Sequence, residues 1–594
     1  MANERLRYKG GTRKLVLAFD VGTTFSGVAY TILYPGLLPQ TSEVTRFPGQ
    51  DSGDSRIPSV MYYTPTGQMR AAGAEARRPE MKSAARKESL FFVEWFKLHL
   101  CPQNLKPREI GQTKEYVPPP LPPGKNAVDV FADFLSYLFK CARNFIQQSH
   151  ADGEKLWASV QDNIDIVLSH PNGWEGPQQA QMRTAACIAG LIPIAEDDRL
   201  RFVSEGHASI QYCLGSGIAS EPVLDNGSTT IMLIDAGGGT VDIVTYRVLS
   251  LVPLSLAEIA PDDCLLQGST RVDARAEEYF KRRLKGTRYV LSTGLNRIRD
   301  RFVMDCKHRF ACREDDYFLD LGEYVDDDPR FGIQDGLLEI SGADMAKLFE
   351  PSVAGIVDAV KKQRKYTNVP ISMAFLVGGF SGSDWMYSQL KLHFDKQRIS
   401  ISRPDSKLNK AVAHGAVSFY LQDVVSRRIS KCTYGVKSSR LYDKGDPGHK
   451  SRKSSLYYDL AGDARIPGHF DHLIRKGDTI LENREITESY DLKCLPEDVQ
   501  RLSTEKTTIY RYCGQSQAPA WVDLAPNKIK PMCSTFADFS AVPAIRREGP
   551  KGSYYVREYK IIIAAGGTEL KAQISWEENG IEKRGPATIV WAEF

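Results

Sequence analysis

Two apolar runs in this chain end in an aspartate and lead into glycine-rich turns. Residues 14–33 read KLVLAFD, ending at Asp20, then VGTTFSG, then VAYTIL. Residues 231–248 read IMLID, ending at Asp235, then AGGGT, then VDIVTYRV. Apolar segments that flank a short loop predict β-hairpins. Because the skeleton D-x-G-[TG]-[TG] occurs in both halves of the chain, it predicts two related lobes.

Helical periodicity lies between the two hairpins. Phe131 and Leu135 belong to a helical pattern over 127–145. Pro177 suits the first turn of a second helix, over 176–191. The short apolar run DIVLSHP predicts a strand directly before that second helix.

The middle of the chain is predicted to be mostly helical. Residues 251–370 are charged and look helical, with a loop near EYVDDDPRFG. Residues 374–386, AFLVGGFSGSDWM, predict a strand, two glycines and the start of a helix. Residues 409–425 again predict a helix.

The pattern then changes to β. Positions that alternate with the period of a strand include Leu570, Ala572, Ile574 and Trp576. Asn579-Gly580 is a hairpin-turn signal. The basic stretch within 424–432 is interpreted as an interdomain connector. We therefore expect an α/β domain over 14–425 and a mostly β domain over 432–594.

Composition excludes several classes of protein. The 594 residues are 42% hydrophobic and 25% charged, which is typical of a globular protein. A net charge of +4 gives no overall attraction to nucleic acid or to a membrane. The eleven cysteines include no CxxC pair, which indicates reduced thiols. With no signal peptide and no apolar run of membrane-spanning length, a cytoplasmic location is expected.

The glycine-rich turns suit phosphate binding, because backbone N–H groups bind anions well and side chains would block their approach. An aspartate at the end of each strand would face these phosphates, which requires a cation between them. Mg²⁺ with its water shell is the expected ion. One such hairpin is usually only a tight turn, but two of them with a third strand running into LVGGFSG favour a nucleotide site. The patterns GxxxxGK[ST] and GxGxxG after a strand are both absent from the sequence.

At this point the sequence resembles a known family. AFDVGTTFSGVAY, LIDAGGGTVDIV and AFLVGGFSGS resemble the two phosphate segments and the adenosine segment of the actin-like ATPase superfamily. The residues within these segments, and the order of the segments, are similar to those of the heat-shock 70 kDa proteins. LPPGKNAVDVFADFLSYLF, SHPNGWEGPQQAQMRTAACIAGL and GSTRVD resemble the divergent heat-shock 70 kDa protein 12 branch. The resemblance implies a two-lobed actin-like (ribonuclease H-like) ATPase domain over 14–425, followed by a β-rich domain that resembles the family only loosely.

The resemblance also implies roles for individual residues. Asp20 and Asp235 would hold Mg²⁺ through water. Lys97, in EWFKLHL, would neutralise γ-phosphate charge and orient the attacking water, and Glu205 would lie near both metal and water. The implied phosphate contacts are Gly22, Thr23, Thr24, Gly237, Gly238, Gly239 and Thr240. The implied ribose and adenine contacts are Gly268, Ser269, Lys307, Gly378 and Gly379. The catalytic group would be Lys97, Glu205, Asp235 and Thr240.

The implied activity is binding and hydrolysis of Mg-ATP, with ADP as product and lobe closure coupled to the β domain. Client polypeptides or co-chaperones would be its partners, and neither nucleic acid nor a membrane is expected to be. Two alternatives stay open: a small-molecule kinase of the same superfamily, and a nucleotide-sensing scaffold with negligible hydrolysis.

Three departures from the family pattern concern affinity and mechanism. Gly382 stands at or next to the place of an arginine that stacks on adenine in the common chaperones. Asn409 stands where they carry an aspartate. No long helical lid and no acidic tail follow the β domain, so trapping of unfolded peptide under a lid is not expected.

Overall fold

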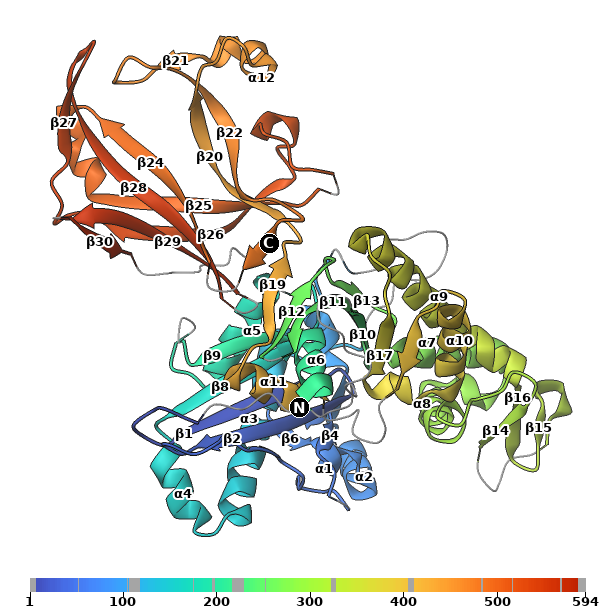
Figure 1. Ribbon diagram of the computed structural model, residues 1–594. Helices are drawn as coiled ribbons and strands as arrows, with labels where there is room; N and C mark the ends of the chain where they lie inside the picture. The colour runs from blue at the N-terminus through green and yellow to red at the C-terminus, as the bar shows by residue number, and fades with distance from the viewer. Residues whose placement is uncertain are drawn as a thin grey trace. The chain divides into compact units, whose positions relative to one another are not determined.

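The computed structural model (Figure 1) shows a mixed α/β protein, as the sequence predicts. It describes residues 7–51, 53–103, 105, 118–174, 176–194, 198–215, 229–251, 253–321, 327–403, 411–481, 484–514, 516–566, 569–578 and 580–585. The chain forms two compact units, Met1–Trp174 with Gln181–Val425 and Glu175–Ala180 with Ser426–Phe594.

The first sheet of the first unit is built around its first hairpin. Its strands are β1 (Lys14–Asp20), β2 (Phe25–Leu33), β3 (Thr41–Glu43), β4 (Arg56–Pro58), β8 (Ile164–His170) and β9 (Leu200–Ser204). Their order is β3-β2-β1-β8-β9, with β4 paired to β2. β2 is antiparallel to both β1 and β3, whereas β8 and β9 continue parallel to β1.

The second sheet repeats this plan around the second hairpin. Its strands include β10 (Thr230–Ala236), β11 (Val241–Leu251), β12 (Leu254–Glu258), β13 (Asp263–Leu265), β17 (Met373–Val377) and β18 (Ser400–Ser402). The order β18-β17-β10-β11-β12 has the same directions, because β11 is antiparallel to β10 and β12 while β17 and β18 are parallel to β10. Both predicted hairpins are therefore confirmed, and they occupy equivalent places in two similar sheets.

Strand β1 is apolar throughout because both of its faces are buried. Phe19 lies in the core formed with helix α3 (Ala127–Ser149), and its neighbour Ala18 lies in the core formed with helix α11 (Ala411–Leu421). A strand covered on both sides reads as a continuous apolar run. Helix α3 confirms the helix predicted from 127 onward, and Asn126 caps it by accepting hydrogen bonds from two backbone N–H groups of its first turn.

Helix α6 (Glu205–Gly215) connects the cores of the two sheets. Its Ala208 packs with β1 and α11, whereas its Ile210 packs with β10. Gly415 of α11 lies directly against the backbone of Ala208, where a side-chain carbon would overlap the carbonyl group. This close crossing fixes α6, and therefore fixes Glu205 at its N-terminal end.

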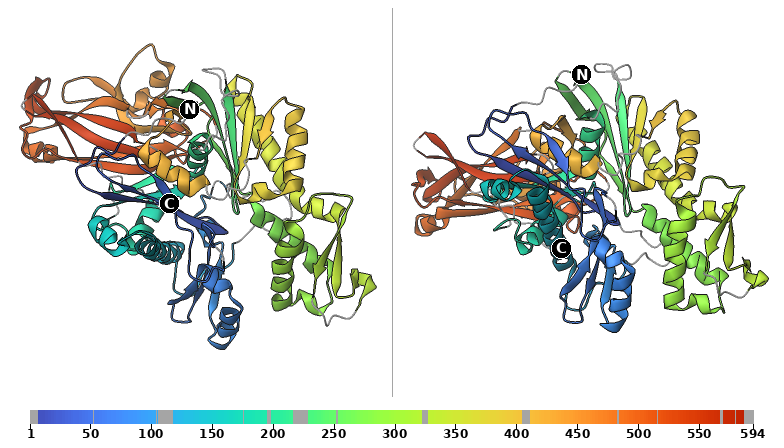
Figure 2. Two further views of the ribbon diagram at one scale, coloured as in Figure 1. Left: turned by 60° about the horizontal axis from the view of Figure 1, so that its bottom comes forward. Right: turned by 90° about the horizontal axis from the view of Figure 1, so that it is seen from below.

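Helices α9 (Gly342–Thr367) and α10 (Asp384–Asp395) cover the other face of the second sheet (Figure 2). Helix α7 (Ser269–Arg283) contributes to the same core. The expectation that 251–370 is mostly helical is wrong in part, because this segment also contains β12, β13 and a small sheet. The strands of the small sheet are β14 (Asp316–Asp320), β15 (Ile333–Gln334) and β16 (Leu337–Ser341). Leu319 is the one buried residue of β14, so the strand has no apolar alternation to detect.

The remaining elements between residues 56 and 382 are short, apart from the helices α5 and α8. The strands are β5 (Val60–Tyr63), β6 (Met69–Ala72) and β7 (Phe91–Glu94). The α-helices are α1 (Gly73–Arg77), α2 (Pro79–Lys87), α4 (Gly153–Val160), α5 (Pro177–Ile188) and α8 (Ser292–Arg301). The tighter or wider turns are η1 (Phe96–Leu100), η3 (Arg288–Val290), η4 (Phe302–Lys307), η5 (Pro329–Phe331) and η6 (Gly379–Gly382). No helix within the described ranges combines the length and apolarity that a membrane crossing requires.

The second unit is mostly β and contains two five-stranded sheets. One is β21 (Tyr457–Tyr458), β22 (Ala464–Ile474), β20 (Thr433–Leu441), β25 (Thr504–Tyr512) and β26 (Ile529–Asp538). The other is β24 (Glu485–Cys494), β28 (Gly552–Gly566), β29 (Glu569–Glu578) and β30 (Ile581–Arg584), with β27 (Ile545–Gly549) on β28. Ile509 and Ile561, one from each sheet, share one core.

Two details of this unit bear on the sequence predictions. The segment interpreted as a connector contains strand β19 (Val425–Ile429), which pairs with β23 (Thr479–Leu481). The predicted last hairpin is confirmed, since Glu578 pairs with Ile581 across a two-residue turn. Asn579 of that turn lies outside the described residues.

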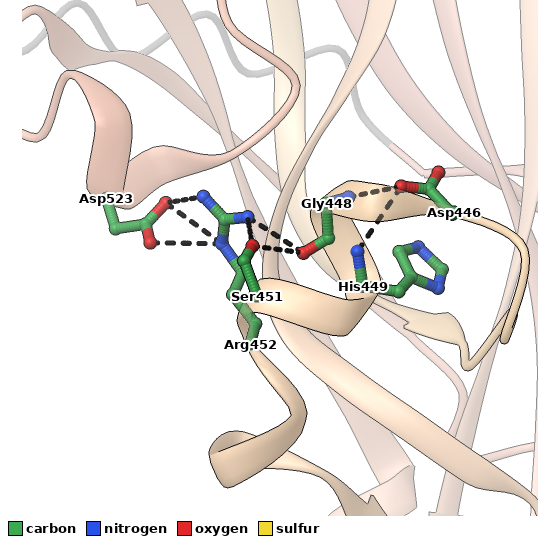
Figure 3. A network of polar contacts seen from close by, with 6 residues as sticks. All are labelled: Asp446, Gly448, His449, Ser451, Arg452 and Asp523. Atoms are coloured by element: carbon green, nitrogen blue, oxygen red, sulfur yellow. Dashed lines mark hydrogen bonds and ion pairs between the residues drawn. The ribbon is translucent and has the colours of Figure 1, made fainter.

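A polar network holds the short helix α12 (Pro447–Ser451) in the second unit (Figure 3). Asp446 accepts hydrogen bonds from the N–H groups of Gly448 and His449, at 2.6 and 3.3 Å. Arg452 forms an ion pair with Asp523 at 2.7 Å and also donates to the Gly448 carbonyl. The guanidinium stacks on Trp521, which shows that this network is a structural joint between α12 and the 3₁₀ turn η10 (Val522–Leu524).

Candidate functional site

The first hairpin turn runs from Asp20 to Thr24, between β1 and β2. Gly22 donates its backbone N–H to the Ser26 hydroxyl at 3.1 Å. A side chain at Gly22 would overlap the Phe25 carbonyl, so the turn requires glycine at this position. The turn therefore presents its backbone and the hydroxyl groups of Thr23 and Thr24 at the end of the buried strand β1.

The second hairpin turn, Gly237 to Thr240, is supported from behind by helix α7. Backbone N–H groups of residues 268–270 donate to the carbonyls of Gly239, Gly237 and Gly238, at 2.9 to 3.2 Å. Within the described part of the chain, the N–H groups of Gly238 and Gly239 donate no hydrogen bond. The carbonyl groups of the loop are thus hydrogen-bonded to the start of α7, whereas the N–H groups of Gly238 and Gly239 stay available. Available N–H donors are what an anion requires.

The two turns touch each other. A side-chain carbon on Gly238 would overlap the Thr24 hydroxyl, and one on Gly239 would overlap the Thr23 hydroxyl. Both glycines are therefore needed for this close approach. The structure brings the two sequence-predicted loops, from the two sheets, to one place.

Buried charges lie beside these turns. Lys97, on η1, is 2% exposed, and its Nζ lies 2.5 Å from Oε1 of Glu205. Asp20 accepts a hydrogen bond from Ser169 at 2.9 Å, and Asp235 accepts one from Ser209 at 2.8 Å. These contacts join β1, β8, α6 and β10 in a single polar cluster.

The carboxylates of the cluster hold more negative charge than the single lysine balances. Burial, followed by repulsion from Glu205, raises the pKa of Asp20 to about 6. Burial and then Glu205 raise the pKa of Asp235 to about 7, and Asp20 adds to this shift. Burial alone would lower the pKa of Lys97, but the Glu205 and Asp20 carboxylates outweigh it and raise the pKa. Such a site favours a bound cation, because a cation relieves the repulsion between ionised carboxylates.

In the described part of the chain, no three acidic, histidine or cysteine side chains are grouped closely enough to form an all-protein metal site. Mg²⁺ usually keeps several waters and is held by one or two carboxylates together with phosphate oxygens. A cation held by Asp20 and Asp235 through its water shell is compatible with this arrangement. The buried carboxylates, the raised pKa values and the donating loop fit a hydrated Mg²⁺ ion with a phosphate chain.

The predicted ribose and adenine residues adjoin the same cluster. Gly268 and Ser269 lie against the Gly237–Gly239 turn. Lys307 forms an ion pair with Asp273 at 2.6 Å and donates to the Ser269 carbonyl at 3.0 Å. Its ammonium is thus held at the start of α7, and its contact with adenine stays a prediction.

Gly378 and Gly379 follow β17 and complete the cluster. Gly378 has φ +85° and lies against the Asp235 carboxylate, where a side chain would overlap an oxygen of Asp235. Gly379 faces Arg56. At Gly382 a side-chain carbon would meet nothing within 4 Å, and Asn409 lies outside the described residues. Each predicted site residue is therefore in or beside one cluster of contacts.

Gly378→Ala is expected to destabilise the protein by about 2 kcal/mol or more, because alanine is strained at this φ and its methyl group would displace Asp235. Urea unfolding measures the change. Gly382→Ala is the matched control and is expected to stay within about 0.5 kcal/mol of the wild type. Equal stability of the two variants would contradict the close packing of Gly378 on Asp235.

Sequence reasoning missed Asp242, which is 1% exposed and accepts a hydrogen bond from the backbone N–H of Asn172 at 2.7 Å. Burial, followed by Glu205 and Asp235, raises its pKa well above the usual range. The available signal was an ionisable residue inside the apolar strand VDIVTYRV, two positions after Thr240. Asp242 adds a fourth carboxylate to the cluster.

A curated protein shares this chain's sequence pattern. The chain is similar to heat shock 70 kDa protein 12B of Homo sapiens. The two are 23% identical over an alignment of 506 residues, which covers 71% of each protein. This match supports a relationship to the heat-shock 70 kDa proteins and no finer assignment. No protein-family model matches the chain.

Proposed function

We propose that this chain is a heat-shock 70 kDa-type protein that binds Mg-ATP between the two turns and hydrolyses it. The observation that carries the proposal is the direct contact of two glycine-rich turns from two sheets of the same order and direction. Each turn follows a strand with an aspartate at or next to its last residue, Asp20 in β1 and Asp235 in β10. This arrangement supports a two-lobed actin-like domain, and the similarity to heat shock 70 kDa protein 12B supports the choice of family.

Phosphate binding would fall to the N–H groups of Gly238 and Gly239 and to the hydroxyls of Thr23 and Thr24. Neutral donors held in place by the fold stabilise developing charge without reorganising. When bound, Mg²⁺ neutralises phosphate charge, and Asp20 and Asp235 would hold it through water. Gly378 would let the nucleoside side of the ligand approach the backbone.

Lys97 and Glu205 would position the attacking water. The raised pKa of Lys97 keeps its ammonium protonated at neutral pH, so it acts as a cation and a hydrogen-bond donor. One of its three donors binds Glu205, which leaves two for a phosphate oxygen and a water. Asp235, with its pKa raised to about 7, suits acceptance of a proton from that water, and Thr240 supports the adjacent turn.

Calorimetric titration of Mg-ATP into the full chain, with phosphate release measured in parallel, tests the proposal. Binding is expected to require Mg²⁺ and to disappear with EDTA. Absence of binding would exclude the proposal. Phosphate transfer to a sugar or polyol would favour the small-molecule kinase instead, and binding with hydrolysis at background would favour the nucleotide-sensing scaffold.

The β-rich unit would use the nucleotide state to change its grip on a client polypeptide or co-chaperone. Support for this coupling is the similarity to a heat-shock protein over 71% of the chain. The reaction itself needs only the cluster of the first unit.

A further inference from the structure

Arg56 approaches the proposed nucleotide site from a part of the chain that carries no motif. It begins strand β4 and pairs with Gly27 of β2, so the first hairpin holds its backbone. Its N–H donates to Asp54 at 3.1 Å, and its carbonyl accepts from Gln50 at 2.6 Å. The backbone is therefore fixed from three directions, which leaves the side chain to reach across the turn.

The guanidinium group lies between the first hairpin and the glycines after β17. Its central carbon is 5.0 Å from the centre of the Phe25 ring, and Phe25 directly follows Thr24. Its Nη1 is 3.2 Å from the position that a side-chain carbon on Gly379 would take. Phe25 is 45% exposed, so the arginine rests on a ring that the core does not bury. Arg56 thus spans the two sides of the proposed site.

Among the described residues, the donors of this guanidinium have no protein acceptor. Nε is buried and has no hydrogen-bond partner, and across the described residues the group forms neither a side-chain hydrogen bond nor an ion pair. Burial lowers the pKa of Arg56, while Asp54 and Asp20 oppose this shift, and an arginine keeps its charge in any case. A buried donor without a partner, here Nε, is costly, so its presence points to an acceptor brought by a ligand.

A phosphate chain matches these donors. The planar guanidinium fork binds two phosphate oxygens at once, and glycine at 379 leaves the space beside it open to a ligand. The only cation among the predicted catalytic residues, Lys97, is already paired with Glu205 in a cluster of carboxylates. Both Lys97 and Arg56 act on Asp20, and a second positive charge there would offset the charge of a polyphosphate that Lys97 only partly neutralises.

We propose that Arg56, held by Phe25, is a phosphate-binding residue of the nucleotide site. This inference rests on the proposed function, since it assigns a further ligand contact to the same site. The common chaperones carry an arginine at or next to the position of Gly382. Arg56, beside Gly379, would give this chain an arginine near the nucleoside instead.

The test is calorimetric titration of Mg-ATP into the full-length wild type, Arg56→Gln and Arg56→Lys at two salt concentrations. Arg56→Gln is expected to bind at least tenfold more weakly, about 1.4 kcal/mol. Arg56→Lys keeps the charge and is expected to recover part of the loss. The affinity of Arg56→Gln is also expected to fall less steeply with salt than that of the wild type, because one charge contact is missing.

Arg46→Gln is the matched control, because Arg46 also lies over a phenylalanine, Phe145, at 5.4 Å, but is exposed and bonded to Ser149. It is expected to bind Mg-ATP like the wild type. Equal binding by Arg56→Gln and the wild type overturns the inference, and so does an Arg56→Lys variant as weak as Arg56→Gln with unchanged salt dependence. A wild type that binds no Mg-ATP overturns the proposed function instead, so the two failures are distinct.

Discussion

Asp235→Asn is expected to stabilise the nucleotide-free protein at pH 8 while weakening Mg-ATP binding at least tenfold. Burial and Glu205 raise the pKa of Asp235 from 3.8 to about 7 in the folded protein. Above pH 7 folding must therefore keep an ionised carboxylate where it is unfavourable, at a cost of about 4 kcal/mol for a shift of this size. Asparagine still accepts the Ser209 hydrogen bond and carries no charge.

The sign of this effect fixes its pH dependence. The folded protein binds the proton of Asp235 more tightly than the unfolded chain does, so its stability falls as pH rises from about 4 to about 7. Urea unfolding in EDTA should therefore show a gain for Asp235→Asn at pH 8 that is less than half as large at pH 5. Asp358→Asn, at a carboxylate 74% exposed, is the control without effect. A loss of stability at pH 8, or unchanged Mg-ATP affinity, would contradict the assignment.

Lys97→Met is expected to destabilise the protein by about 3 to 5 kcal/mol, because it leaves Glu205 buried without its partner beside other carboxylates. Phosphate release is expected to fall to background, since no other ammonium reaches Glu205 in the described structure. Urea unfolding and a phosphate-release assay measure the two effects separately.

The double variant Lys97→Met with Glu205→Gln separates stability from catalysis. Removing the unpaired charge should recover most of the lost stability but none of the hydrolysis. Full activity of Lys97→Met would exclude a catalytic role. Wild-type hydrolysis at background and unchanged in Lys97→Met would leave the scaffold as the function.

Much of the candidate site follows from local sequence. Asp20 and Asp235 are visible because each ends an apolar run before a glycine turn, and that local pattern also dictates the hairpins. Arg56 is not visible in this way, because its place depends on the pairing of β4 with β2, a contact between separate segments. Asp242 is visible as a polar residue in an apolar strand, but its direction toward Glu205 follows only from the strand pairing.

The part of the fold that sequence reasoning missed has the same physical origin. In the small sheet, β14 has one buried residue and β15 is only two residues long, so neither strand carries an apolar period. Leu338 and Ile340 of β16 are buried in alternation, but five residues are too short a run to stand out within a segment interpreted as helical. The last strands of the second unit were predictable because Ala572 and Ile574 are buried in alternation. Periodicity reveals an element only where one of its faces is covered.

Because Gly238 and Gly239 have no side chains, the two halves of the first unit are in direct contact at these residues. Thr23 and Thr24 lie directly against these glycines, so a group placed between the two turns would require the halves to move apart. A methyl group added at either glycine would overlap the facing threonine and keep the two halves apart. Opening of the two halves would then precede nucleotide binding between the turns.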